Sequence, residues 1–267
     1  MPPGGVPRGG APWPPEAPLD FTDKALILRV GRFRESDVWV RLMTPSRGVL
    51  QAFAFGGSRS RRRFCGCLDT FNQVLFTFRG SRGGRYLYLS EGTLLAAHAG
   101  LRADPSRLGV ARNCADFFEM VSLGPAGAGR AYTLLSDTLA AVSGGAAVSG
   151  LFPVYFRARL AFDQGFLPPL WICCECGGQL PDSRAARFDL RGGRLYCPVC
   201  AGAAQGAFLP CGGETSLLAR QVMERGPEDW KALNASPTAR REFFDIVDRF
   251  VRFHLGVGYE DGGFRRL

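Results

Sequence analysis

Two pairs of cysteines constrain this chain of 267 residues more than any other feature of its sequence. Cys173 and Cys176 form one Cys-x-x-Cys pair, and Cys197 and Cys200 form a second pair after twenty intervening residues. This spacing is typical of a four-thiolate zinc site, in which two tight turns bring four sulfurs around one ion. Four thiolates complete a closed tetrahedron with no open position for water. The sequence therefore predicts a bound Zn²⁺ whose role is structural.

The residues around the pairs suit this interpretation. Gly177 follows the first pair, where a tight turn often requires a positive φ, and Gly192-Gly193 supplies a hairpin turn before the second. Cys174 is an alternative ligand to Cys173, with one intervening residue instead of two. Two other interpretations remain. A redox Cys-x-x-Cys normally opens a helix after a strand, and paired disulfides are typical of exported proteins.

The overall composition is that of a globular protein. Hydrophobic residues make up 46% and charged residues 21% of the chain, and no apolar run approaches the length of a membrane span. Residues 1–19 are rich in Pro and Gly and lack the layout of a signal peptide. Nine cysteines without such a leader indicate a reducing compartment. We therefore expect a cytoplasmic protein with no membrane contact.

The net charge of +9 is unevenly distributed. Residues 20–100 hold thirteen Lys or Arg against six Asp or Glu, a net charge of +7, whereas residues 101–267 carry a net charge of +2. A basic first domain on a nearly neutral remainder is typical of a protein that binds polyanions. An Arg-rich genome is the simpler alternative, since Lys occurs only at positions 24 and 231. Codon bias would raise Arg everywhere, however, and does not explain the asymmetry.

Five short apolar runs fall within the basic region. They lie near residues 24–30, 38–42, 48–56, 74–78 and 86–95, and the last is interrupted at Gly92. Alternating apolar positions predict strands, and five short strands in some seventy residues predict a closed oligonucleotide-binding (OB-type) barrel. In the third run, Val49, Phe53 and Phe55 share one parity.

An arginine-rich loop separates the third and fourth of these runs. The candidate DNA-binding residues are Arg59, Arg61, Arg62 and Arg63 in this loop, and Arg79, Arg82 and Arg85 around the next hairpin. Single strands are held by a positive groove together with aromatic faces on which bases stack. Phe64, Phe71 and Trp39 are candidate faces, although core packing is the more common role of such residues. The alternative for the arginines is a solvated loop. Cys65 and Cys67 have no partner pair nearby and are read as incidental.

Helical periodicity begins at Asp104, a predicted N-cap followed by Pro105. Helices are expected from there to Gly124-Pro125, and over 131–142, 151–164, 215–225 and 238–255. The last begins after Ser236 as N-cap and Pro237 at its first position. His254 is expected at the core or its rim.

These patterns predict an α+β protein of five segments: a disordered tail (1–20), an OB-type domain (21–100), a helical domain in two parts (101–170 and 204–267), and a zinc module (171–203) inserted between them. No phosphate-binding loop, nucleophile elbow or His-Glu-x-x-His motif is present in the sequence. We therefore expect a protein that is not an enzyme.

Three stretches together resemble the bacterial RecO family of recombination mediators. The first is Ala25 to Leu28 followed by Glu35 to Asp37 and Leu42 to Gly48. The second is Arg159-Leu160 and then Gly165 to Leu170, leading into the first cysteine pair, and the third is Phe253 to Gly256. The resemblance covers about residues 24 to 256. The Pro-rich N-terminus and the preference for Arg over Lys depart from the family pattern.

The resemblance implies a DNA-repair protein with a barrel, a helical domain and, in many members, a zinc module. Family members bind single- and double-stranded DNA, anneal complementary strands and work with RecR to load RecA on protein-coated single strands. They also contact the acidic C-terminal tail of single-stranded-DNA-binding protein. The alternatives are a zinc-ribbon nucleic-acid-binding factor of transcription or translation, and a thiol–disulfide enzyme.

Overall fold

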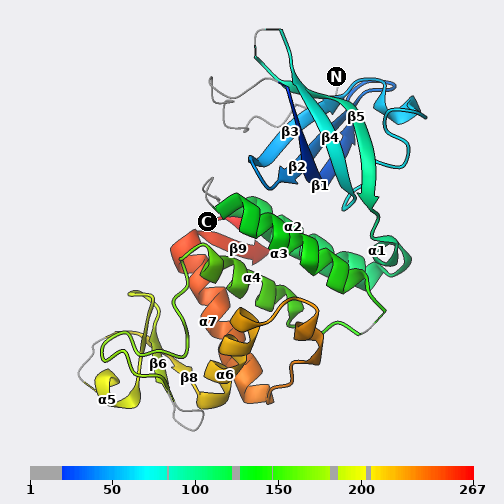
Figure 1. Cartoon of the computed structure of the whole chain (residues 1–267). Coiled ribbons are helices and arrows are strands. Elements are labelled where there is room, and N and C mark those ends of the chain that lie inside the picture. The colour runs from blue at the N-terminus through cyan, green and yellow to red at the C-terminus, as the bar shows by residue number, and fades with distance from the viewer. Residues whose placement is uncertain (1–19, 83, 122–126, 146, 181–185, 203–205) are drawn as a thin grey trace. The chain divides into compact units, whose positions relative to one another are not determined.

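The computed structural model describes residues 20–82, 84–121, 127–145, 147–180, 186–202 and 206–267. The chain divides into two compact units, Met1–His98 and Ala99–Leu267, which are described separately (Figure 1). Residues 1–19 of the predicted tail lie outside the described residues. The finer boundaries expected at 170/171 and 203/204 stay predictions.

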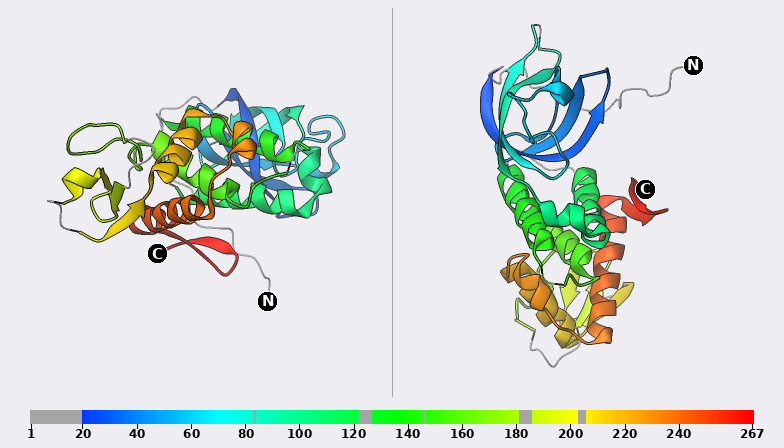
Figure 2. Two further views of the ribbon diagram at one scale, coloured as in Figure 1. Left: turned by 90° about the horizontal axis from the view of Figure 1, so that it is seen from below. Right: turned by 90° about the vertical axis from the view of Figure 1, so that its right-hand side faces the viewer.

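The first unit is a closed barrel of five strands. These are β1 (Phe21–Arg32), β2 (Val38–Thr44), β3 (Gly48–Ala54), β4 (Gln73–Gly80) and β5 (Leu87–Ala96). Their order is β1-β2-β3-β5-β4, with β4 pairing back to β1 and a parallel β3–β5 pair among antiparallel neighbours. Figure 2 shows these strands curving around a common interior. The expected five-stranded OB-type barrel is confirmed.

The barrel interior is apolar and fully enclosed. Phe76 and Phe78 have no exposed surface, and their rings meet edge to face with centroids 6.1 Å apart. The expected interruption at Gly92 is wrong, because β5 continues through this residue, which pairs with Phe76. A Cβ at Gly92 would lie 2.6 Å from a ring carbon of Phe76. The glycine therefore makes room for an aromatic ring within an unbroken strand.

The second unit is built mainly from helices. They are α1 (Ala99–Ala103), α2 (Pro105–Met120), α3 (Ala128–Ser143), α4 (Phe152–Asp163), α6 (Gly213–Glu224) and α7 (Pro237–Leu255). Asp104 caps α2 by accepting a hydrogen bond from the Ser106 amide, and Ser236 caps α7 by accepting one from the Ala239 amide. Both predicted caps are confirmed. The helix stop predicted at Gly124-Pro125 falls outside the described residues.

A C-terminal hairpin extends the helical unit beyond the predicted elements. Strands β9 (Val257–Glu260) and β10 (Gly263–Arg266) follow α7 after Gly256, which adopts φ 59° at the end of that helix. The ring of Phe264 packs against Phe117 of α2 with centroids 5.3 Å apart. Arg266 donates a hydrogen bond to the Met120 carbonyl at 3.0 Å. The hairpin thus covers the C-terminal end of α2.

A small sheet lies between α4 and α6 in the chain. It consists of β6 (Ala186–Asp189), β7 (Arg194–Tyr196) and β8 (Phe208–Cys211) in the order β7-β6-β8, with the short helix α5 (Pro198–Ala201) after β7. Single turns of 3-10 helix occur at η1 (Gly57–Arg59) and η3 (Asp229–Ala232). Among the described residues, none of the helices combines the length and apolar character needed to span a membrane.

Candidate metal centre and nucleic-acid interface

The first cysteine pair lies in a tight turn. The Gly177 amide donates to the Cys173 carbonyl at 3.0 Å, and the Cys173 amide donates to the Gly178 carbonyl at 2.9 Å. Gly177 has φ +68°, a conformation that glycine adopts without the strain of a Cβ. A bridge between Ile172 and Gln179 closes the base of the turn. The positive φ expected at Gly177 is therefore present.

The second pair lies at the start of α5. Cys197 is its N-cap residue, and its sulfur accepts a hydrogen bond from the Cys200 amide at 3.4 Å. The β6–β7 hairpin that leads to it turns at Gly192-Gly193, where Gly193 has φ +59°. The Asp189 carboxylate accepts hydrogen bonds from the amides of Arg191 and Gly192, both at 3.1 Å, and so fixes this turn.

The two turns bring four sulfurs together. The ligand atoms of Cys173, Cys176, Cys197 and Cys200 all lie within 4.8 Å of one another. Tetrahedral zinc with Zn–S bonds of about 2.3 Å requires sulfurs about 3.8 Å apart, so this donor set fits a metal ion. Cys174 is exposed and is not part of the cluster. The geometry thus favours Cys173 over the alternative ligand.

The protonation of the cluster also suits metal binding. Burial by itself would raise the pKa of Cys173, but hydrogen bonds from the backbone amides of Cys176, Cys197 and Glu175 lower this pKa to about 6. A hydrogen bond to the side chain of Cys197, together with desolvation, raises the pKa of Cys200 to about 12. Of these two thiols, Cys173 is therefore the one that loses its proton more readily. A cation bound among the sulfurs would favour the thiolate at every position.

The small sheet is anchored to the last long helix. Phe188 of β6 is fully buried, and its ring lies 6.1 Å from that of Phe250 in α7. The His254 ring stacks on Phe250 with centroids 4.4 Å apart, and its Nε2 lies 2.7 Å from the Leu190 carbonyl. His254 is exposed and so lies at the rim of the core, within the range expected from the sequence. This packing links the metal centre to the helical unit.

All seven predicted DNA-binding arginines are exposed in the barrel unit, in two groups. The arginine loop, residues 56–63, holds Arg59, Arg61, Arg62 and Arg63, and the β4–β5 hairpin holds Arg79, Arg82 and Arg85. Arg59 lies 3.6 Å from the Glu35 carboxylate, in an ion pair open to solvent. Arg63 donates a hydrogen bond to the Phe55 carbonyl at 2.7 Å and lies over the Phe64 ring. Arg61 and Arg62 are therefore the loop arginines best placed to contact a ligand.

The three candidate stacking faces differ in accessibility. Phe64 and Phe71 are each only 3% exposed and pack in the interior, so neither can receive a base. Trp39 retains partial exposure on the outside of β2, where its indole covers Gly31. Trp39 is paired across the sheet with Phe53 of β3. The core interpretation therefore holds for two of the three residues.

Sequence reasoning missed an aromatic surface on the outside of the barrel. It consists of Phe33, Phe53, Phe55, Tyr86 and Tyr88. Phe53 of β3 and Phe55, which directly follows this strand, do share one parity, but this parity faces outward, whereas Ala52 and Ala54 face the core. The small size of these two alanines was a usable signal. In this alternating strand the small residues face the barrel interior, and the large aromatic residues face outward.

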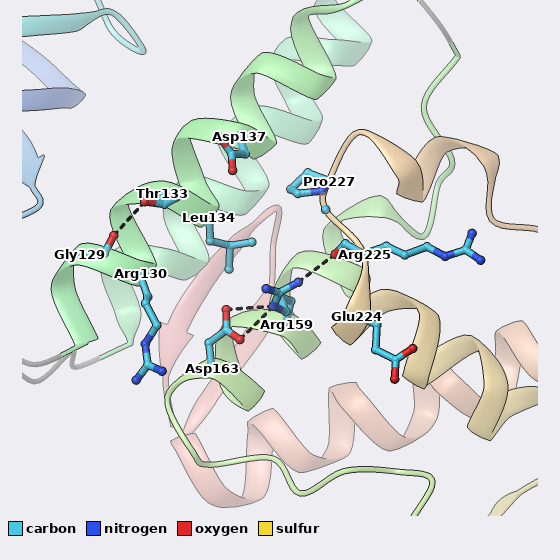
Figure 3. A pocket seen from close by; sticks show the side chains of 11 residues that line it. Gly129, Arg130, Thr133, Leu134, Asp137, Arg159, Asp163, Glu224, Arg225 and Pro227 are labelled. Atoms are coloured by element: carbon cyan, nitrogen blue, oxygen red, sulfur yellow. Dashed lines mark hydrogen bonds and ion pairs between the residues drawn. The ribbon is translucent and has the colours of Figure 1, made fainter.

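A pocket of about 390 Å³ is present in the helical unit, between α3, α4 and the end of α6 (Figure 3). Arg159 Nε donates to both carboxylate oxygens of Asp163 at 2.9 Å, and its Nη1 donates to the Arg225 carbonyl at 2.9 Å. Asp137 also lines the pocket, and burial raises the pKa of its carboxyl group. The lining thus carries charges of both signs, and it has no evident preference for a polyanion.

Comparison with known proteins accounts for nearly the whole chain. Residues 19–98 match the family model "Recombination protein O N terminal", and residues 102–260 match "Recombination protein O C terminal". The DNA repair protein RecO of Nitratidesulfovibrio vulgaris strain DP4 is 49% identical over 253 residues, which span 93% of this chain and all of that protein. The proteins of the same name from Oleidesulfovibrio alaskensis and Solidesulfovibrio magneticus are each 46% identical over 249 residues, again spanning 93% of this chain and their full lengths. The chain therefore belongs to the RecO family of DNA repair proteins.

Proposed function

We propose that this protein is a recombination mediator that binds single- and double-stranded DNA, anneals complementary strands and helps to load RecA on protein-coated single strands. The observation that carries the proposal is the set of seven exposed arginines on the barrel of a RecO-family chain. The net charge of +7 over residues 20–100 supports a polyanionic ligand. In this role the protein needs no catalytic residue and is not an enzyme.

The arginine loop suits annealing because phosphates are common to every strand. Arg61 and Arg62 neutralise phosphates, release condensed counterions and thereby reduce the repulsion between two approaching strands. Contacts to phosphates leave the Watson–Crick edges of the bases free to pair. The same contacts serve duplex DNA, so one surface accounts for binding to both forms.

The partners and the metal follow from the family likeness and the cysteine cluster. We propose RecR, the acidic tail of single-stranded-DNA-binding protein and, indirectly, RecA as partners, and the cytoplasm, at the nucleoid, as the location. Cys173, Cys176, Cys197 and Cys200 would hold Zn²⁺ as a structural ion, because four thiolates leave no open coordination position. The membership in the RecO family weighs against a general zinc-ribbon factor of transcription or translation.

Strand annealing tests this proposal. Complementary oligonucleotides coated with the cognate single-stranded-DNA-binding protein should anneal faster with the parent protein than without it. The double variant Arg61→Ala with Arg62→Ala should anneal more slowly and bind single strands more weakly at low salt. If both arginines contact phosphates, the slope of log K against log salt should flatten by about 1.4, at about 0.7 for each contact.

A matched control changes charge on the other unit. Arg241 and Arg249 are exposed on α7, so Arg241→Ala with Arg249→Ala removes the same charge from the helical unit. This control should bind and anneal like the parent. A parent protein that neither binds DNA nor accelerates annealing would refute the proposed function, and equal losses in the two double variants would refute the role of the loop.

A further inference from the structure

The aromatic surface is built from three separate parts of the barrel unit. Phe53 and Phe55 belong to β3 and its end, Tyr86 and Tyr88 to the start of β5, and Phe33 directly follows β1. Successive rings touch: the centroids of Phe33 and Phe53 lie 5.2 Å apart, and those of Phe53 and Tyr86 lie 5.6 Å apart. The rings therefore form one continuous surface rather than scattered exposed residues.

Two rings of this surface are more exposed to solvent than apolar residues of the core. Phe33 is 40% exposed and Tyr86 is 45% exposed, although the barrel interior is already filled by other side chains. The position of Tyr86 is fixed, because its amide donates to the Ser81 hydroxyl at 3.2 Å and its carbonyl accepts from the Ser81 amide at 2.9 Å. Packing of the fold thus does not require these two rings, yet the backbone holds them in place.

Three arginines lie next to residues of the aromatic surface. Arg63 of the arginine loop donates to the carbonyl of Phe55, and the Arg34 guanidinium lies 5.7 Å from the centre of the Phe33 ring. Arg79 of β4 is paired directly with Tyr88 of β5, so the two side chains share one face of the sheet. Flat aromatic faces bordered by cations are complementary to unpaired bases on a phosphate backbone.

We propose that the aromatic surface stacks the bases of single-stranded DNA, while the bordering arginines hold its phosphates. This inference rests on the proposed DNA-binding function and adds a distinction to it. Phosphate contacts treat single and double strands alike, whereas ring faces contact bases only where the bases are unpaired and unstacked. Tyr86 and Phe33, the most exposed rings of the surface, receive the bases.

Fluorescence anisotropy with three labelled probes tests this inference. The probes are an oligo(dT) of about 16 nucleotides, within the range that one such barrel accommodates, an abasic strand of equal length and a duplex. The parent protein should bind oligo(dT) on the order of tenfold more tightly than the abasic strand, since stacking adds to affinity for each base. Phe33→Ala with Tyr86→Ala should lose that advantage and bind the duplex and the abasic strand as the parent does.

Two further variants separate stacking from folding. Phe33→Leu with Tyr86→Leu keeps apolar side chains but removes the flat faces, and it should lose affinity for oligo(dT) as the alanine variant does. Tyr259→Ala removes a tyrosine that is equally 45% exposed, but in the helical unit, and should leave all three affinities unchanged. Thermal unfolding of each variant identifies any that does not fold.

The outcomes distinguish this inference from the proposed function. A parent protein that binds oligo(dT) no better than the abasic strand overturns the inference and leaves DNA binding intact. So does a folded leucine variant that binds oligo(dT) as tightly as the parent, because the flat ring faces would then contribute nothing to binding. A parent that binds none of the three probes overturns both proposals.

Discussion

The barrel and the small sheet of β6, β7 and β8 differ in how they are packed. The barrel closes on itself and buries a continuous apolar interior, including Phe76 and Phe78. The sheet of β6, β7 and β8 has strands of only three or four residues and joins the core of the helical unit through Phe188. The barrel therefore has a continuous apolar core of its own, whereas we expect the small sheet to depend on a metal ion held by the four cysteines. We therefore expect substitutions on the barrel surface to leave its fold intact, and substitutions of the clustered cysteines to disrupt the fold of the small sheet.

Removal of the metal ligands should give the largest effect. Cys197→Ser with Cys200→Ser should release the ion, because apparent zinc-binding free energies of about 10–16 kcal/mol in small modules contribute directly to folding. Amide hydrogen exchange should rise over residues 171–202 and stay unchanged in the barrel. Elemental analysis measures the metal directly.

Cys174→Ser is the matched control for this prediction, since Cys174 is exposed and lies outside the cluster. It should keep about one zinc per chain. Two outcomes would contradict the prediction. One is parent protein purified without chelator that holds well below one zinc per chain, and the other is a double variant that retains its metal.

A change inside the barrel should give a moderate effect confined to that unit. In Gly92→Ala the added Cβ meets the Phe76 ring at 2.6 Å, and such overpacking lowers the free energy of unfolding by about 1–3 kcal/mol. Gly109→Ala lies within α2 with no atom within 4 Å of its added Cβ, so it should stabilise the helical unit by about 0.5–1 kcal/mol. Denaturant unfolding measures both changes. If Gly92→Ala changed the stability of the helical unit instead, or Gly109→Ala that of the barrel, the packing described for Gly92 would be contradicted.

The α7 cap should give a smaller effect. Ser236→Ala removes the hydroxyl that accepts from the Ala239 amide, and loss of an N-cap of this kind costs about 1 kcal/mol of unfolding free energy. Thr238→Ala changes an exposed residue of the same first turn that is not the cap, and it should change stability much less. If both variants unfold at the same denaturant concentration, the cap contributes nothing measurable.

The smallest expected effect is a dependence on pH. Hydrogen bonds from the hydroxyl and the amide of Ser236 lower the pKa of Glu214 below its ordinary value. A carboxyl group whose folded pKa is lowered stabilises the fold above its unfolded pKa of about 4.3, and this stabilisation is lost as the pH falls through the folded pKa. Stability of the helical unit below about pH 4 should therefore fall less steeply in Ser236→Ala than in the parent. Parallel pH profiles would contradict this link.

Local signals in the sequence predicted much of the fold and the metal centre. The cysteine spacing identified the four clustered sulfurs, and the capping residues Asp104 and Ser236 marked the starts of α2 and α7. Each of these signals is complete within a few residues of chain. Their physical basis, a turn or a cap, does not depend on distant partners.

Features that depend on distant pairing were not predictable in the same way. The outward direction of Phe53 and Phe55 follows from the parallel β3–β5 pair, which brings Phe53 beside Tyr88. The C-terminal hairpin is ordered by the contact of Phe264 with Phe117, far away in the sequence. The interruption expected at Gly92 failed for the same reason, because the ring that fills its place comes from another strand.

The position of α7 near the end of the chain has a consequence for synthesis on the ribosome. Every strand of the barrel is complete once β5 has emerged, and domains near the N-terminus generally fold first. The small sheet, in contrast, packs through Phe188 on Phe250, a residue of α7 that is made long after the four cysteines. In a nascent chain the barrel can therefore fold, and the four cysteines are already made, before α7 is available to pack on the small sheet. We therefore expect the small sheet to complete its packing against α7 only after the barrel has folded.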